Sequence, residues 1–142
     1  MKSLILALGL LVQAEAPVHY NLVCTGERNY MMSRQKPDPV ERIYRIDRQR
    51  GAWCEDDCYT AHKIITEPIK PSGGGLVLAA EEDATHEWHV AILSDMSWME
   101  MRDAYKPDTG EHYYSAAITG ECRSAPFTPI PDHVFDEPSA MD

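Results

Sequence analysis

The chain has 142 residues, enough for one domain, and its 23 acidic and 13 basic side chains give a net charge of −10. This balance argues against nucleic acid and anionic membrane surfaces as partners, because both favour Lys and Arg. It permits a basic protein partner, or it simply keeps the protein soluble. After residue 14 the sequence has no apolar stretch long enough for a membrane span.

The first residues have the pattern of a secretory signal peptide. Lys2 supplies a positive charge, residues 4–12 form an uninterrupted apolar run, and Ala14 and Ala16 offer small residues for cleavage. Cleavage after Ala14 is preferred, because cleavage after Ala16 leaves Pro17 next to the cut. We therefore predict a signal peptide over 1–14 and a periplasmic or secreted protein.

The four cysteines predict two disulfides, because an extracytoplasmic compartment is oxidising. Three pairings are possible in principle. Cys54 and Cys58 are close enough in sequence to bridge within one tight loop, which leaves Cys24 to pair with Cys122. We call Cys24–Cys122 the outer bridge and Cys54–Cys58 the inner bridge, after their positions in the sequence. In the chain-entropy model the outer bridge contributes roughly 4.7 kcal/mol to the free energy of unfolding and the inner bridge roughly 2 kcal/mol.

Short alternating segments in the first half of the chain predict β-strands. Residues 18–24 form a first strand that residues 25–29 are expected to break. The two prolines within 35–39 argue against regular structure there. Residues 42–48 form another strand. The run of arginines Arg42, Arg45, Arg48 and Arg50 suggests a solvated surface.

The second half continues in the same way. A short segment at 63–66 and an apolar run at 76–80 lie on either side of a Pro- and Gly-rich loop. Residues 87–93 and 98–102 predict a hairpin, and Pro107 and Gly110 predict a tight turn before a last strand at 112–122. No segment has a sustained helical period.

These elements predict an all-β fold, a small antiparallel barrel or sandwich of about six to eight short strands stapled by disulfides. A single β domain would span 15–126. The tail at 127–142 is rich in proline, and Phe127, Ile130 and Phe135 are expected to pack its first half onto the domain.

The segment from Trp53 to Cys58 is the densest in chemical groups and is the predicted binding region. Glu55, Asp56 and Asp57 would stand on an exposed loop pinned by the inner disulfide, where they can face a basic partner. Three consecutive carboxylates cannot converge on one cation, so we expect no calcium site. Trp53 is a candidate contact residue, although packing in the core is the more common role.

A second candidate site combines methionines with a histidine. Thioethers are soft ligands that suit Cu(I), and Met99 and Met101 would share one strand face near Met96 and His89. Methionine also fills irregular cores, which is the alternative interpretation. His86 and His89 do not form a zinc-protease signature, because the second histidine stands one position too early.

Catalytic patterns are missing from the sequence. It has no Gly-x-Ser-x-Gly elbow and no glycine-rich phosphate loop, and two disulfides would leave no cysteine as a nucleophile. We therefore predict that the protein is not an enzyme and needs no cofactor.

Several short motifs resemble those of a group of small secreted proteins from Gram-negative bacteria. They are Cys24-Thr25-Gly26, Trp53-Cys54 with Cys58, Gly120-Glu121-Cys122 and Ala125-Pro126-Phe127. The resemblance covers most of the chain after the signal peptide and implies no particular activity. Residues 20–26 and the closing Cys122 are more weakly similar to periplasmic lysozyme inhibitors, which are small β-barrels with a disulfide joining the chain ends. The inhibitory Ser-Gly-x-x-Tyr loop of that family is not matched, since Leu76 stands at the position of its Tyr.

We therefore expect a small acidic extracytoplasmic protein with a binding or scaffolding role. The alternatives are an inhibitor of a basic extracellular enzyme, as in lysozyme inhibitors, and a periplasmic copper-handling protein.

Overall fold

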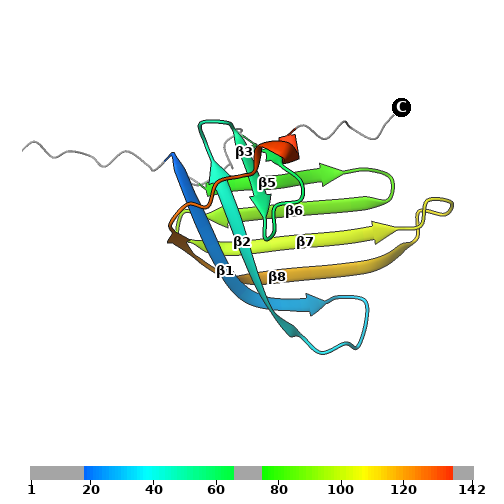
Figure 1. The fold of residues 1–142 in the computed structure, drawn as a ribbon. Coiled ribbons are helices and arrows are strands. Elements are labelled where there is room, and N and C mark those ends of the chain that lie inside the picture. The colour runs from blue at the N-terminus through cyan, green and yellow to red at the C-terminus, as the bar shows by residue number, and fades with distance from the viewer. Residues whose placement is uncertain (1–17, 66–74, 136–142) are drawn as a thin grey trace, which may run out of the picture.

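The computed structural model describes residues 18–65 and 75–135, so the predicted signal peptide lies outside the described residues. Eight antiparallel strands form one sheet (Figure 1). They are β1 (His19–Tyr30), β2 (Asp38–Asp47), β3 (Ala52–Glu55), β4 (His62–Lys63), β5 (Gly75–Glu82), β6 (His86–Leu93), β7 (Ser97–Tyr105) and β8 (His112–Ala125), followed by a 3₁₀ turn, η1 (Asp132–Phe135). Within these residues, none of the helical structure is long and apolar enough to cross a membrane. The predicted all-β class is confirmed.

The sheet curls into a nearly closed barrel. Its strand order is β4-β3-β2-β1-β8-β7-β6-β5, and β1 and β2 cross in front of β5 to β8 (Figure 1). An isolated bridge between Ile65 and Val77 joins the two outer edges, β4 and β5. Residues that face inward from the two halves of the sheet therefore meet in one interior.

The two disulfides form as predicted, Cys24 with Cys122 and Cys54 with Cys58. Cys24 on β1 lies directly opposite Cys122 on β8, with their Cα atoms 4.0 Å apart. Oxidising conditions outside the cytoplasm are consistent with both bridges.

β1 continues to Tyr30, past the break that the sequence predicted at 25–29, and Gly26 is the reason. Gly26 lies opposite Gly120, and a Cβ on Gly120 would stand 2.6 Å from the Cα of Gly26, closer than real side chains approach. The expected break at 25–29 is therefore wrong. The glycine serves a close approach of two strands and does not form a turn.

The expectation of irregular structure at 35–39 is wrong at its end, because β2 begins at Asp38 and includes Pro39. Pro39 pairs with Glu27 of β1, whereas β3 pairs only with the stretch of β2 from Tyr44 onward. This part of β2 thus has a strand on one side only, where a missing N–H is tolerated.

Apolar side chains fill the middle of the barrel. Tyr44 packs edge-on against Trp53 and Trp98, and all three are almost fully buried. The other buried members of this core are Leu22, Cys24, Ile46, Leu78, Ala79, Val90, Ile92, Ile118 and Cys122.

A second, smaller cluster lies outside the barrel beneath the C-terminal segment. Ile130 and Val134 are buried against the Cys54–Cys58 bridge and Ala52. Side chains and backbone hold this segment in place: Arg45 donates to the Pro129 carbonyl, Arg50 pairs with Asp132 at 3.0 Å, and Asn21 and Thr128 exchange two hydrogen bonds. The 127–135 part of the tail thus covers the inner disulfide.

Candidate functional site

Three arginines from three strands turn inward near one end of the barrel: Arg28 on β1, Arg42 on β2 and Arg102 on β7. Alternation along each strand places them on the same side as buried residues, since Arg42 lies opposite Cys24 and Arg28 lies opposite Ile118. The interpretation of Arg42 as part of a solvated strand surface is therefore wrong. Its position two residues before buried Tyr44 turns it inward.

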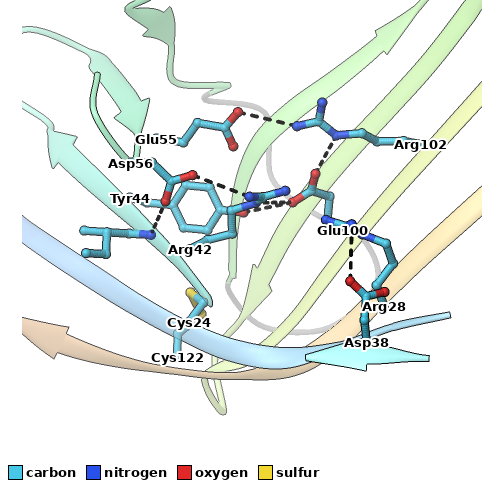
Figure 2. Close-up of polar contacts among 11 residues, drawn as sticks. Cys24, Arg28, Asp38, Arg42, Tyr44, Glu55, Asp56, Glu100, Arg102 and Cys122 are labelled. Atoms are coloured by element: carbon cyan, nitrogen blue, oxygen red, sulfur yellow. Dashed lines mark hydrogen bonds and ion pairs between the residues drawn. A yellow bond between two sulfur atoms is a disulfide. The ribbon is translucent and has the colours of Figure 1, made fainter. Parts of the chain in front are cut away.

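Glu100, on β7, is the carboxylate that these arginines surround, and it is only 1% exposed. Its Oε1 accepts a hydrogen bond from Arg102 Nε at 2.6 Å, and its Oε2 accepts one from the Tyr44 hydroxyl at 3.3 Å. Arg42 Nε lies 3.6 Å from Oε2 (Figure 2). A buried carboxylate without partners costs several kcal/mol, and these contacts offset that cost.

Burial raises the pKa of Tyr44 well above its usual value, and the negative charges of Glu100 and Glu55 add to the effect. The phenol therefore keeps its proton at all physiological pH values and acts as a fixed hydrogen-bond donor to Glu100.

Glu55 reaches the same network from β3, on the other side of the interior. Its Oε1 accepts a hydrogen bond from Arg102 Nη2 at 3.4 Å. Burial raises the pKa of Glu55, although the charge of Arg102 opposes this shift. For Arg102 itself, burial lowers the pKa, but the contacts with Glu100 and Glu55 outweigh it and raise the pKa. Arg102 thus connects β7 to β3 across the barrel.

These side chains border a pocket of about 190 Å³. Its lining contains the three arginines, Glu100 and Tyr114, with Ala116 and Ile118 as the apolar part. Three further carboxylates contact the arginines without lining the pocket: Asp38 lies 3.6 Å from Arg28, Asp56 lies 3.5 Å from Arg42, and Glu55 contacts Arg102. The pocket itself therefore presents three guanidinium groups and one carboxylate.

This arrangement favours binding over acid–base chemistry. Both oxygens of Glu100 already have partners, and Glu55, the carboxyl group whose pKa is raised, does not line the pocket. Arg28 keeps donors for a ligand, because in the described part of the chain its side-chain contacts use only Nη1. Arg42 Nε is buried and faces Glu100, so it is not open to a ligand.

A larger and more apolar pocket, of about 360 Å³, opens at the opposite end of the strands. Leu22, Leu76, Ile92 and Met96 line it, with Tyr20 and Arg48 among its polar neighbours. One wall begins at Gly75, the first described residue after 66–74.

The three carboxylates of the acidic loop, which were predicted to face a partner together, have different surroundings in the structure. Glu55 turns inward to Arg102, and Asp56 accepts hydrogen bonds from the backbone N–H of Ile43 and from Arg42. Asp57 is exposed and has no side-chain partner among residues 18–65 and 75–135. Two of the three carboxylates thus stabilise the loop.

Trp53 is fully buried, packed against Tyr44 and stacked on His62 at 4.6 Å between ring centroids. Its indole contributes to the core and presents no surface to a partner. The cysteines of this segment are buried as well, and the part of the chain that the structure describes contains no free cysteine.

The methionine candidates separate into two places. Met99 and Met101 point outward from β7, and His89 of β6 lies directly opposite Met101. Met96 instead occupies the β6–β7 turn, where its φ is 68° and its side chain packs against the main core. The fold thus brings three of the four residues together.

The sequence analysis missed Glu100, Arg28 and Arg102 as site residues. A signal exists for two of them: Glu100 and Arg102 follow Trp98 at two-residue spacing and therefore share its inward face. Charged residues at inward positions of a strand indicate a buried pair. The contacts that Glu100 and Arg102 make across the barrel, with Tyr44 and Glu55, could not be predicted from the sequence, because they depend on how the sheet curls.

Comparison with known proteins adds no relative for this chain: no family model matches it, and neither the curated proteins nor the solved structures give a match. The resemblances drawn from short motifs therefore remain predictions.

Proposed function

We propose that this protein is a non-catalytic binding protein that takes the anionic oxygen group of a small molecule into the arginine-lined pocket. The observation that carries the proposal is the inward convergence of Arg28, Arg42 and Arg102 on one pocket, in a chain whose net charge is −10. Guanidinium groups match carboxylate, sulfate and phosphate geometry, with two parallel N–H donors for two oxygens.

The pocket volume limits what enters. About 190 Å³ is below the roughly 300–1,000 Å³ of pockets that take whole organic ligands. The anionic group would therefore enter while the rest of the molecule stays at the opening. Tyr114 and Ala116 offer an aromatic and an apolar contact beside it.

An entering anion would compete with weak ion pairs. The contacts of Arg28 with Asp38 and of Arg42 with Asp56 are 3.6 Å and 3.5 Å long and partly exposed, and such pairs contribute only about 0–1 kcal/mol. Glu100 would keep Arg102 and Tyr44 as partners, so the buried carboxylate stays compensated when Arg42 reorients.

The protein would act in the periplasm or after secretion. The two disulfides and the predicted signal peptide at 1–14 support this placement. A basic protein partner at the acidic loop is less well supported, since Asp57 alone of its carboxylates is unengaged.

The test is a thermal-shift and calorimetric titration at low ionic strength with acetate, succinate, citrate, inorganic phosphate and sulfate. Saturable stabilisation by at least one anion is expected, weakening as NaCl is added because salt screens exposed charges. Comparing the three carboxylates, acetate, succinate and citrate, with phosphate and sulfate shows which class of anion the pocket prefers.

Arg28→Gln is the variant of choice, because it removes one guanidinium group and leaves the Glu100 network intact. It should weaken binding at least tenfold. Arg34→Gln is the matched control, since Arg34 is exposed outside the strands and changes the net charge equally. No stabilisation by any of the anions, or equal binding by both variants, would overturn the proposal.

A further inference from the structure

We infer that the outer face of β6 and β7 carries a Cu(I) site formed by His89, Met99 and Met101. This site is separate from the proposed anion pocket, because these residues point away from the barrel interior. Alternation shows the direction: Trp98 and Glu100 on β7 are buried, whereas Met99 and Met101 are 43% and 37% exposed.

The strand register places the three donors close together. His89 lies directly opposite Met101, which puts their Cβ atoms about 5 Å apart, and Met99 stands on the diagonal at about 7–8 Å. Both methionine side chains and the imidazole are long enough to converge above the sheet from these positions. Register fixes this proximity, because a slip by one residue would turn the donors to opposite faces.

The neighbours of the three donors leave them room. Ala80 is the partner of His89 on β5, Ala91 is the partner of Met99 on β6, and Ala117 is the partner of Met101 on β8. These small side chains cannot cover the sulfur atoms. Among the described residues, no hydrogen bond or ion pair engages the His89 ring.

The donor set selects the metal. Thioether sulfur is a soft ligand that suits Cu(I), and imidazole also binds copper, whereas Mg²⁺ and Ca²⁺ need oxygen ligands. A group of three His, Cys, Asp or Glu residues able to hold a metal does not occur in the described part of the chain. The site therefore predicts selectivity for soft monovalent ions such as Cu(I) and Ag(I).

The test is an anaerobic titration of the full disulfide-bonded protein with Cu(I), in competition with bicinchoninate as a coloured chelator. One Cu(I) per chain with a dissociation constant below micromolar is expected. Met99→Leu with Met101→Leu should weaken binding at least 100-fold, and His89→Gln at least tenfold. Leucine is close to methionine in volume, so unchanged thermal unfolding would show that the fold is intact.

The control is Met31→Leu with Met32→Leu. It removes two methionines of the β1–β2 connection that are more exposed than the proposed ligands, at 66% and 50%, and it should leave binding unchanged. Titration with Ag(I), observed through ¹³C-labelled methionine methyl groups, should shift Met99 and Met101 and leave Met31, Met32 and Met96 in place. No uptake tighter than micromolar, or equal loss in the control variant, would refute the site.

Discussion

The Cys24–Cys122 bridge and the Cys54–Cys58 bridge lie in regions of the molecule that are built in different ways. The outer bridge joins the 12-residue β1 to the 14-residue β8, and the two strands pair along most of their length. The inner bridge closes a short loop in which Asp56 and Cys58 both have positive φ, 49° and 62°.

The two regions also differ in what surrounds the sulfur atoms. Cys24 and Cys122 belong to the main core, beside the close approach of Gly26 and Gly120. Cys54 and Cys58 belong to the small outer cluster under Ile130. The strand pair is thus held by backbone pairing and by the core, whereas the loop depends on side-chain contacts. This difference predicts which substitutions affect the whole fold and which affect the loop alone.

The largest expected effect is the loss of the outer bridge. Cys24→Ala with Cys122→Ala should lower the free energy of unfolding by about 4.7 kcal/mol, because the bridge restricts a loop of 98 residues in the unfolded chain. The inner pair, Cys54→Ala with Cys58→Ala, should cost only about 2 kcal/mol, since its separation is four residues. Urea unfolding followed by tryptophan fluorescence measures both, and a larger cost for the inner pair would reverse the comparison.

Gly120→Ala should come next, at about 1–3 kcal/mol, because the new methyl group would meet the backbone of Thr25 and Gly26 on the paired strand. Gly110→Ala is a useful contrast. Gly110 has open space around it and a φ of 69°, so the cost there is backbone strain of about 1 kcal/mol. Equal unfolding midpoints for Gly120→Ala and the unsubstituted protein would show that β1 and β8 separate easily.

The smallest effect concerns the pH dependence contributed by Glu55. Burial raises the pKa of Glu55, so the unfolded chain loses this proton before the folded protein does as pH rises. As pH rises from the usual carboxyl pKa to the raised pKa of Glu55, the contribution of this group to the free energy of unfolding therefore decreases, and above the raised pKa it is constant. Glu55→Gln cannot ionise and should give a flatter profile of unfolding free energy over that interval. Asp57→Asn is the control in the same loop, and an unchanged profile for Glu55→Gln would contradict the assignment.

Much of the fold was readable because it follows from local pattern. The hairpin of β6 and β7 appeared as two alternating segments, and Pro107 with Gly110 marked the turn that the structure has there. Cysteine spacing led to the correct pairing. The predictions for 25–29 and for Pro39 are wrong because Gly and Pro are common in turns but also occur in strands. Gly26 allows two strands to approach closely, and Pro39 lies where β2 has a strand on one side only.

The charged pocket was much less predictable. Sequence pattern predicts that Arg42 is solvated and that the carboxylates of the acidic loop form an exposed surface. In the structure Arg42 turns inward, and Glu55 and Asp56 contact Arg102 and Arg42 of the interior network. Sequence distance hides such contacts, since Tyr44 and Glu100 are 56 residues apart when they form their hydrogen bond.

The sequence by itself determined that this is a β protein with two disulfides, because strand alternation and cysteine spacing are local properties. It also placed Met99 and Met101 on one strand face. Only the tertiary structure decided that the acidic loop is mostly committed to its own support and that Glu100 lies among inward arginines. The physical reason is that burial and charge pairing depend on which strands the curled sheet brings face to face, and the residues that meet across the barrel come from segments far apart in the chain.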